Sequence, residues 1–452
     1  MSDNPFAGML ASPAMERLFE APRVLAAMLE FEAALARAEA EAGVIPAAAA
    51  TTIVACCRSG AFDPEALVAA SRRAGSLAIP LVKQLTEQVA AADAEAGGYV
   101  HWGSTSQDVI DMGMVLVTRE ALALLDADLA RLIASLLDLA ERHAATPMLG
   151  RTLMQPAVPT TLGFKLAGWA APLVRARRRL AESAARALQV QLGGAVGTLG
   201  SLGSAGTAVA DGVGRHLGLP VPATAWHTQR DEWVGLGCEV GLLCGSLAKI
   251  GEDLALLTQA EVGELAEPSG PGRGGSSAMP HKRNPVSAMI ARSAGVRAPQ
   301  RVAALLAAMA QAHERGLGDW QAELAEWPGL FVTAHGALLA LVEACGGLEV
   351  DSARMARNID ALHGLVFAEG ASIALAGVLG RKRAFALLED LSRQVVASGR
   401  PLRELVAAAV AADPALQSRI APAAVDAWFD PVQATAAAAR SARASVARLR
   451  AD

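Results

Sequence analysis

The chain has 452 residues, of which 53% are hydrophobic and only 4% aromatic, and its formal net charge is −5. This length allows two or three domains or one long unit of many helices. The abundance of alanine and the scarcity of β-branched runs favour an all-α protein over a sheet protein. The longest basic run, Arg177-Arg178-Arg179, lies inside a helical pattern, so no nucleic-acid partner is expected.

Signals for export, membranes and cofactors are absent from the sequence pattern. The residues Met1-Ser2-Asp3-Asn4-Pro5 lack the basic and then apolar pattern of a signal peptide, and no long apolar run is free of charge and glycine. The five cysteines are spaced neither as zinc ligands nor as a disulfide framework. The glycine-rich residues 193–206 contain no GxGxxG motif. We therefore expect a cytoplasmic protein with no membrane partner, no metal ion and no organic cofactor.

An N-terminal helical domain, residues 1–108, is expected to end in the polar segment His101-Trp102-Gly103-Ser104-Thr105-Ser106-Gln107-Asp108. Asp108 or Ser106 can cap the helix that follows, which is a purely structural role. A cap alone does not need threonine, serine and glutamine together. Because the free N–H groups of a helix start attract anions, these hydroxyls and N–H groups predict a carboxylate-binding site.

Regular leucine spacing next predicts a long helix from Ile110 to about Ala145, at the start of a central bundle of residues 109–350. A helix of roughly 35 residues is over about 50 Å long and needs neighbours along its whole length, so we expect other subunits among them. The leucines recur at alternating steps of three and four: Leu122, Leu125, Leu129, Leu132, Leu136 and Leu139.

A second polar segment, residues 150–161, follows this helix and contains Arg151, Thr152 and Gln155. Its prolines, Pro156 and Pro159, predict an irregular conformation. Thr152 and Gln155 can donate hydrogen bonds to a substrate. Arg151 can either bind a substrate carboxylate or pair with a carboxylate of the protein.

The same leucine spacing predicts a second long helix, from about Leu236 to Leu257, in which Gly237, Gly241 and Gly245 are four residues apart. A glycine inside a helix costs about 1 kcal/mol relative to alanine. Close approach of another helix would offset this cost, which again suggests an oligomeric bundle. The alternative is that the helix tolerates these glycines without such a contact.

The most informative segment opens with Gly272, Gly274 and Gly275 and closes with Pro285. Glycines allow a tight backbone with exposed N–H groups, and the prolines interrupt any helix. Such a loop can hold a carboxylate with backbone donors and a lysine, and can keep a serine hydroxyl beside a C–H bond. Its central run is Ser276-Ser277-Ala278-Met279-Pro280-His281-Lys282-Arg283-Asn284.

Two further histidine segments lie outside these three regions. His313-Glu314-Arg315 contains an arginine that can hold a carboxylate with two hydrogen bonds, or can form a surface ion pair. His227 remains a candidate, whereas His143, His216, His335 and His363 are interpreted as structural or exposed. Beyond Gly346-Gly347, a plausible hinge, we expect a C-terminal helical domain of residues 351–452.

The three polar segments, in this order and separation, resemble the three characteristic regions of the fumarase/aspartase superfamily. The order GSSxMPxKxN in the loop matches the superfamily signature residue by residue, and the similarity extends to residues 28–36. The resemblance implies a homotetramer of long-helix bundles, each flanked by two smaller helical domains, with every active site shared between three subunits. It also implies removal of a proton α to a carboxylate, through an aci-carboxylate intermediate.

Within the superfamily, Leu153 separates two possible reactions. Adenylosuccinate lyases resemble this chain but carry a histidine at this position, which acts on the nitrogen leaving group. Leucine cannot transfer a proton, so a reaction that protonates an amine would lose its acid. The muconate cycloisomerases of the superfamily also resemble this chain, and opening of a muconolactone releases a carboxylate, which needs no proton. The resemblance therefore implies interconversion of 3-carboxy-cis,cis-muconate and a carboxymuconolactone, in the protocatechuate branch of the β-ketoadipate pathway.

The resemblance also assigns roles to the polar residues. Ser276 would transfer the proton at the α carbon, and Lys282 would stabilise its alkoxide and, with Asn284, the intermediate. Because the substrate is a trianion and the chain is acidic, binding would depend on a basic cluster of Arg151, Lys282, Arg283 and Arg315. The residues expected to bind substrate are His101, Thr105, Ser106, Arg151, Thr152, Gln155, Asn284 and Arg315.

Three alternatives stay open at this point. The chain could be an adenylosuccinate lyase, which Leu153 disfavours. It could be a cycloisomerase of another muconate, such as a sulfonated one, because sulfonate and carboxylate need similar donors. A helical scaffold without activity would be expected to carry a damaged signature loop, and this loop is intact.

Overall fold

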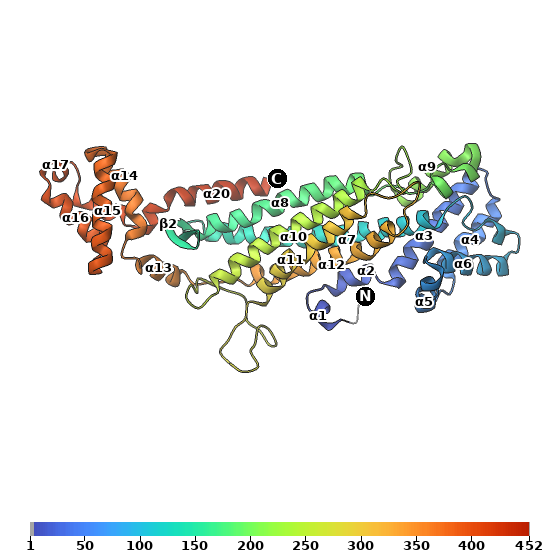
Figure 1. Ribbon diagram of the computed structural model, residues 1–452, viewed down its shortest axis with the longest axis horizontal. Coiled ribbons are helices and arrows are strands. Elements are labelled where there is room, and N and C mark those ends of the chain that lie inside the picture. The colour runs from blue at the N-terminus through green and yellow to red at the C-terminus, as the bar shows by residue number, and fades with distance from the viewer. Residues whose placement is uncertain (1–3, 452) are drawn as a thin grey trace. The chain divides into compact units, whose positions relative to one another are not determined.

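The computed structural model describes residues 4–451, and helices make up most of this part of the chain (Figure 1). The predicted all-α class is confirmed. The N-terminal helices, which precede the longest helix, are α1 (Pro5–Gly8), α2 (Pro13–Leu18), α3 (Ala21–Glu41), α4 (Ala47–Ser59), α5 (Pro64–Ala74), α6 (Ala78–Ala92) and the short 3₁₀ helix η1 (Ala96–Tyr99).

The predicted first long helix is confirmed as α7 (Ser106–Arg142), which has 37 residues. The second is confirmed as α10 (Asp231–Leu257). Between them, the polar residues after α7 form a hairpin and the glycine-rich residues form short 3₁₀ turns. These elements are β1 (Pro147–Thr152), β2 (Gln155–Thr161), α8 (Leu162–Ala187), η2 (Gly194–Val196), η3 (Gly200–Ala205) and α9 (Gly206–Leu217).

After α10, a long loop leads to two more long helices and then to the shorter C-terminal helices. The elements are β3 (Leu265–Ala266), α11 (Val286–Ala307), α12 (Asp319–Gly346), β4 (Glu349–Val350), α13 (Ser352–Asp360), η4 (Leu365–Phe367), α14 (Ala368–Leu379), α15 (Arg381–Ser398), α16 (Leu402–Ala412), α17 (Pro414–Gln417), α18 (Pro422–Trp428), α19 (Pro431–Ala434) and α20 (Ala436–Ala451).

The contacts divide the described chain into two compact units. The first unit comprises residues 4–129, 176–248 and 290–339, and the second comprises residues 130–175, 249–289 and 340–451. Each long helix therefore contributes residues to both units. The proposed boundaries of the N- and C-terminal domains fall beside the starts of α7 and α13, and the division into three domains stays a prediction.

In the first unit, aromatic side chains fill the space between the long helices. Trp327 is fully buried and stacks on Trp233, with ring centroids 4.1 Å apart. Its indole N–H donates to the Thr118 hydroxyl, 2.9 Å away, so burial leaves no polar atom of the ring unpaired. Helix α3 packs against α4 and α9 (Figure 1). This packing holds α3 and α4, which precede the first polar segment, in the same unit as α9.

The glycines of α10 allow other helices of the same unit to approach closely. A Cβ atom on Gly237 would lie 2.9 Å from Leu305, and one on Gly241 would lie 2.6 Å from Val302. At Gly245, no atom lies within 4 Å of such a Cβ. The predicted close approach is thus confirmed at two of the three glycines, and its partner there is the same chain.

In the second unit, β1 and β2 form an antiparallel hairpin that contacts α13. The short strands β3 and β4 pair at the base of the loop between α10 and α11. Helices α14, α15, α16 and α18 share an apolar core that includes Leu375, Leu388 and Leu402. The hairpin of β1 and β2 is thus held by α13, and the loop between α10 and α11 starts from the paired strand β3.

Helices α10 and α12 are long and apolar enough, by length and composition alone, to cross a membrane. The same helices are half buried and 78% buried, respectively, over their most apolar windows. Most of the apolar window of α12 and half of that of α10 therefore lie in the protein core.

Candidate functional site

The first polar segment is organised by the carboxylate of Asp108, which is fully buried in the first turn of α7. Its Oδ2 accepts a hydrogen bond from the backbone N–H of Thr105 at 3.0 Å and a longer one from the Ser104 hydroxyl at 3.4 Å. This is the reciprocal contact of a capping box, in which an acidic residue in the first turn reaches back to the helix start. Asp108 thus fixes the backbone on which the predicted substrate-binding residues stand.

The glycine-rich segment supplies the other donors to Asp108. The backbone N–H groups of Gly193 and Gly194 lie 3.0 and 2.9 Å from its two oxygens. A Cβ on Gly194 would lie 2.8 Å from the Gly103 carbonyl oxygen, so only glycine allows this approach. His227 Nε2 lies 2.7 Å from Asp108 Oδ1, and the His227 side chain is buried. His227 is therefore a structural partner of Asp108.

The structure brings together two sequence-predicted residues that are 210 positions apart. Arg315 Nη1 donates to the Thr105 hydroxyl at 2.6 Å, and both residues belong to the first unit. Arg315 has no carboxylate partner among residues 4–451, so its charge is available to a ligand. Ser106 is the first residue of α7. Their role in substrate binding stays a prediction.

The second polar segment is an ordered hairpin, and the expectation of an irregular conformation is wrong. Thr152 pairs with Gln155 across a two-residue turn whose residues, Leu153 and Met154, have φ values of 49° and 64°. Two successive left-handed residues give the turn that suits the twist of a hairpin. Leu153 is 97% exposed at its tip. Thr152 and Gln155 thus flank the tip, on either side of the residue that distinguishes the two reactions.

Arg151 is engaged by a carboxylate of the protein. Its guanidinium donates two hydrogen bonds to the buried Glu264, at 2.8 and 3.1 Å, and Asn358 donates a third to the same carboxylate at 2.8 Å. Arg283 is paired in a similar way, with Glu349 at 2.8 Å. Both arginines of the predicted basic cluster are thus paired with carboxylates of the protein, and their role in substrate binding stays a prediction.

The signature loop is anchored at its base by Glu267, whose side chain is buried. Its carboxylate accepts hydrogen bonds from the backbone N–H groups of Ser287 and Ala288, at the start of α11, and from Arg273 at 3.1 Å. A carboxylate at a helix N-terminus is favoured by the free N–H groups there. These contacts close the loop onto the start of the following helix.

Within the loop, the backbones of Gly274 and Asn284 are in direct contact. The Asn284 backbone N–H donates to the Gly274 carbonyl oxygen at 2.8 Å, and its side-chain amide donates to the Gly275 carbonyl oxygen at 3.2 Å. Gly274 has a φ of 65°, and a Cβ there would lie 2.5 Å from the Asn284 carbonyl oxygen. The predicted need for glycine is met at this position. Asn284 was predicted to bind substrate, and one N–H of its side-chain amide is used instead to hold the loop.

The hydroxyl of Ser276 is held by backbone N–H groups. Ser276 Oγ accepts hydrogen bonds from the N–H groups of Ala278 and Met279, at 3.3 and 3.1 Å. The backbone then turns, with the Lys282 N–H bonded to the Met279 carbonyl oxygen at 3.0 Å. Among the described residues, the Lys282 ammonium group has no ion-pair partner. The loop therefore offers an oxygen with two fixed donors and, in the same turn, a free positive charge.

Not all predicted site residues meet within the described chain. Among residues 4–451, no hydrogen bond or ion pair joins Thr152 or Gln155 to the loop of residues 272–285. The contacts that are present link Thr105 with Arg315, and Arg151 with Glu264. Asp108 and Glu264, which organise these regions, were not predicted as site residues, because their partners lie about one hundred positions away in the sequence.

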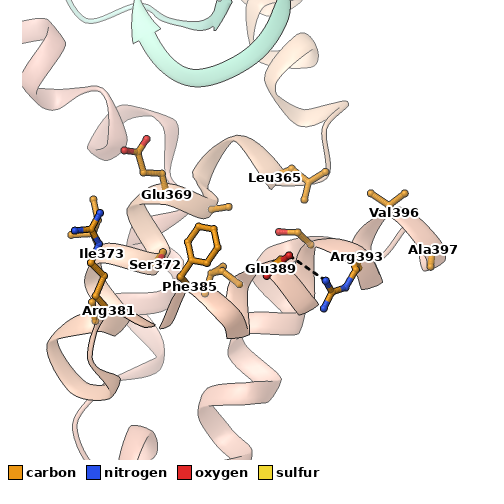
Figure 2. A pocket seen from close by; sticks show the side chains of 14 residues that line it. Leu365, Glu369, Ser372, Ile373, Arg381, Phe385, Glu389, Arg393, Val396 and Ala397 are labelled. Atoms are coloured by element: carbon orange, nitrogen blue, oxygen red, sulfur yellow. Dashed lines mark hydrogen bonds and ion pairs between the residues drawn. The ribbon is translucent and has the colours of Figure 1, made fainter. Parts of the chain in front are cut away.

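Two other features could be mistaken for a site. Ser12, His335 and Asp128 are hydrogen bonded in a row, at 2.7 and 2.9 Å, but all three are buried and Ser12 caps α2. A groove of about 1090 Å³ lies between α14 and α15, and Figure 2 shows Phe385 and Ile373 on its walls. The groove contains none of the predicted site residues.

Comparisons with known proteins place this chain in a family. Residues 10–299 match the protein family described as Lyase. Over 90% of its length, the chain is 51% identical to the 3-carboxy-cis,cis-muconate cycloisomerase of Pseudomonas aeruginosa, 89% of which is covered. It is also 42% identical, over 92% of its length, to a nitrosuccinate lyase of Streptomyces davaonensis, 88% of which is covered.

A solved structure agrees with these sequence matches. The fold is similar to that of the 3-carboxy-cis,cis-muconate lactonizing enzyme from Pseudomonas putida, with a TM-score of 0.92. The two sequences are 43% identical, and the match covers 99% of each chain. The similarity therefore extends over the hairpin, the loop and the helices that carry them.

Proposed function

This chain belongs to the lyase family, and we propose that within it the chain interconverts 3-carboxy-cis,cis-muconate and a carboxymuconolactone. The observation that carries the proposal is the Ser276 hydroxyl held by two backbone N–H groups. The high identity to a 3-carboxy-cis,cis-muconate cycloisomerase, over nine tenths of the chain, supports the choice of substrate. The reaction belongs to the protocatechuate branch of the β-ketoadipate pathway.

In lactone formation, one substrate carboxylate attacks the alkene and forms the ring C–O bond. The alkene electrons move toward the neighbouring carboxylate and give an aci-carboxylate, and the Ser276 hydroxyl then donates its proton to the α carbon. Ser276 is left as an alkoxide, which regains a proton from solvent. The N–H groups of Ala278 and Met279 point at the oxygen where this charge develops, so they stabilise the alkoxide without reorganisation.

In lactone opening, the same steps run in reverse. The Ser276 alkoxide removes the α proton, and the ring C–O bond breaks to release a carboxylate. This leaving group needs no proton, which agrees with an apolar residue, Leu153, at the hairpin tip. Positive charge for the intermediate would come from Lys282 and, for a second carboxylate, from Arg315, neither of which is paired with a carboxylate among residues 4–451.

The proposal includes a cytoplasmic homotetramer in which subunits share each active site. Apolar side chains on the long helices support the assembly: Leu242 of α10 is 55% exposed, and Val296 of α11 is 72% exposed. Exposed apolar residues on long helices are a common sign of a subunit interface. The absence of a hydrogen bond between the hairpin tip and the loop in the described chain is consistent with sites completed by other subunits.

An ultraviolet assay tests the reaction. Ring closure removes the conjugated diene of 3-carboxy-cis,cis-muconate, so we expect its absorbance to fall and the lactone to appear in the NMR spectrum of the product. Adenylosuccinate, nitrosuccinate and a sulfonated muconate are the comparison substrates. A higher kcat/KM with any of the three than with 3-carboxy-cis,cis-muconate would overturn the proposed substrate.

A further inference from the structure

His101 lies against a carboxylate that belongs to the core of the first unit. Its Nδ1 is 2.5 Å from Oε1 of Glu32, which is on α3 and only 1% exposed. The His101 side chain is 15% exposed, and its backbone has a φ of 59°. A left-handed conformation is uncommon for histidine and persists when surrounding contacts hold it. Glu32 is thus the contact that fixes this ring, with one edge buried.

Among residues 4–451, His101 is the one basic side chain that contacts Glu32. Glu39 lies two turns further along α3 and is equally buried, and burial together with the charge of Glu32 raises its pKa to about 9. Burial, reinforced by Glu32, also raises the pKa of Cys57 on α4, although Arg37 opposes this. Near neutral pH, Glu39 and Cys57 therefore stay uncharged.

At the start of α3, Arg23 pairs with Glu30 and Glu120. Glu41, at its C-terminal end, pairs with Arg215 and His216 of α9. Asp108 receives three backbone N–H groups and His227. Burial lowers the pKa of His101, but the charge and hydrogen bond of Glu32, with the charge of Asp108, outweigh burial and raise that pKa above its usual value. The ring therefore stays protonated to a higher pH than an exposed histidine.

We propose that Glu32 is a positioning residue that holds His101 as an imidazolium cation, so that His101 binds a substrate carboxylate by charge. His101 is four positions before Thr105, the residue that Arg315 contacts. The first polar segment would then offer two cations to a substrate with three carboxylates. A buried carboxylate is costly unless it is paired, and His101 supplies that pairing to Glu32. The inference rests on the proposed function.

The test compares two matched variants, Glu32→Gln and Glu39→Gln, which lie on one face of one helix with the same burial. With 3-carboxy-cis,cis-muconate, Glu32→Gln should lower kcat/KM at about pH 7.5 at least about tenfold, mainly through KM. The alkaline limb of its pH profile should move down by about one unit or more, because burial of His101 is then opposed only by the charge of Asp108. Glu39→Gln removes no charge near neutral pH, so its profile should match the wild type.

An alkaline limb of Glu32→Gln at the wild-type position would overturn the proposal, as would an equal loss at every pH. If Glu32→Gln does not fold, the double variant Glu32→Gln/His101→Gln buries no charge. It should fold, lose the limb assigned to His101 and bind substrate at least about tenfold more weakly. A wild-type limb in the double variant overturns the proposal. If the wild-type enzyme does not convert 3-carboxy-cis,cis-muconate but acts on nitrosuccinate, only the proposed substrate is overturned. The same pH profiles, measured with nitrosuccinate, then test the role of Glu32.

Discussion

Ser276 and Ser277 are neighbours of the same chemistry, but only Ser276 accepts hydrogen bonds from backbone N–H groups. We predict that Ser276→Ala lowers kcat by about 10²–10³ or more, because the proton carrier at the α carbon is lost. Ser277→Ala is the control and should keep kcat close to the wild-type value. The diene assay measures both, with circular dichroism to show that each variant is folded. Near-normal turnover by Ser276→Ala would contradict the role of Ser276 in proton transfer.

Glu39 leads to a prediction about stability and pH. Its pKa is raised to about 9 in the folded state, by burial and then by Glu32, so the folded protein holds a proton that the unfolded chain releases above its ordinary pKa of 4.5. Stability from this residue therefore decreases as the pH rises from about 4.5 to about 9. Glu39→Gln should raise the melting temperature more at about pH 8 than at about pH 5. A gain that is equal at both pH values would contradict this explanation.

Sequence could predict residues whose neighbours are local, and could not predict partners far along the chain. Ser276, Lys282 and Gly274 belong to one short run, so their order indicated the loop and its need for glycine. Arg151 was predicted to bind substrate, yet its carboxylate partner, Glu264, is 113 positions away. Charge alone does not reveal such pairs, because every carboxylate of the chain is a possible partner until the fold selects one.

At the level of whole elements, the two long helices were predicted because a spacing of three and four repeats over many turns. The hairpin was missed because its prolines suggested irregular backbone, and its turn residues are Leu153 and Met154. A two-residue hairpin turn is usually indicated by asparagine or glycine at its left-handed positions. The hairpin of residues 147–161 contacts α13, which is about 200 residues further along the chain, and the local sequence does not indicate this contact.

The glycines of α10 allow a test at the scale of helix packing. Gly241→Ala would place a methyl group 2.6 Å from Val302, and should destabilise the protein by about 1–3 kcal/mol through overpacking. Gly245→Ala meets no atom within 4 Å, and should stabilise it by up to about 1 kcal/mol, the usual preference of a helix for alanine. Urea denaturation of the two variants checks the difference. A loss of stability at Gly245 would contradict the open face seen in the chain.

The assembly of the whole molecule can be tested by complementation. If each site takes Ser276 and Arg315 from different subunits, mixed tetramers of Ser276→Ala and Arg315→Ala contain some sites with both native residues. Random mixing should restore about a quarter of wild-type activity. Ser276 and Lys282 lie on one loop, so a mixture of Ser276→Ala with Lys282→Met is the control and should restore none. The diene assay on co-refolded mixtures measures both, and no recovery in the first mixture would place both residues in one subunit.

The two donors to the Ser276 hydroxyl are main-chain groups, and this has a consequence for substitutions in the loop. Every amino acid except proline carries the same N–H, so the side chain at position 278, which the signature leaves open, can change without removing the groups that activate the serine. That side chain is exposed. A substitution there can therefore change which substrate fits while the enzyme keeps the groups that catalyse proton transfer. A change of specificity then does not have to pass through an inactive enzyme.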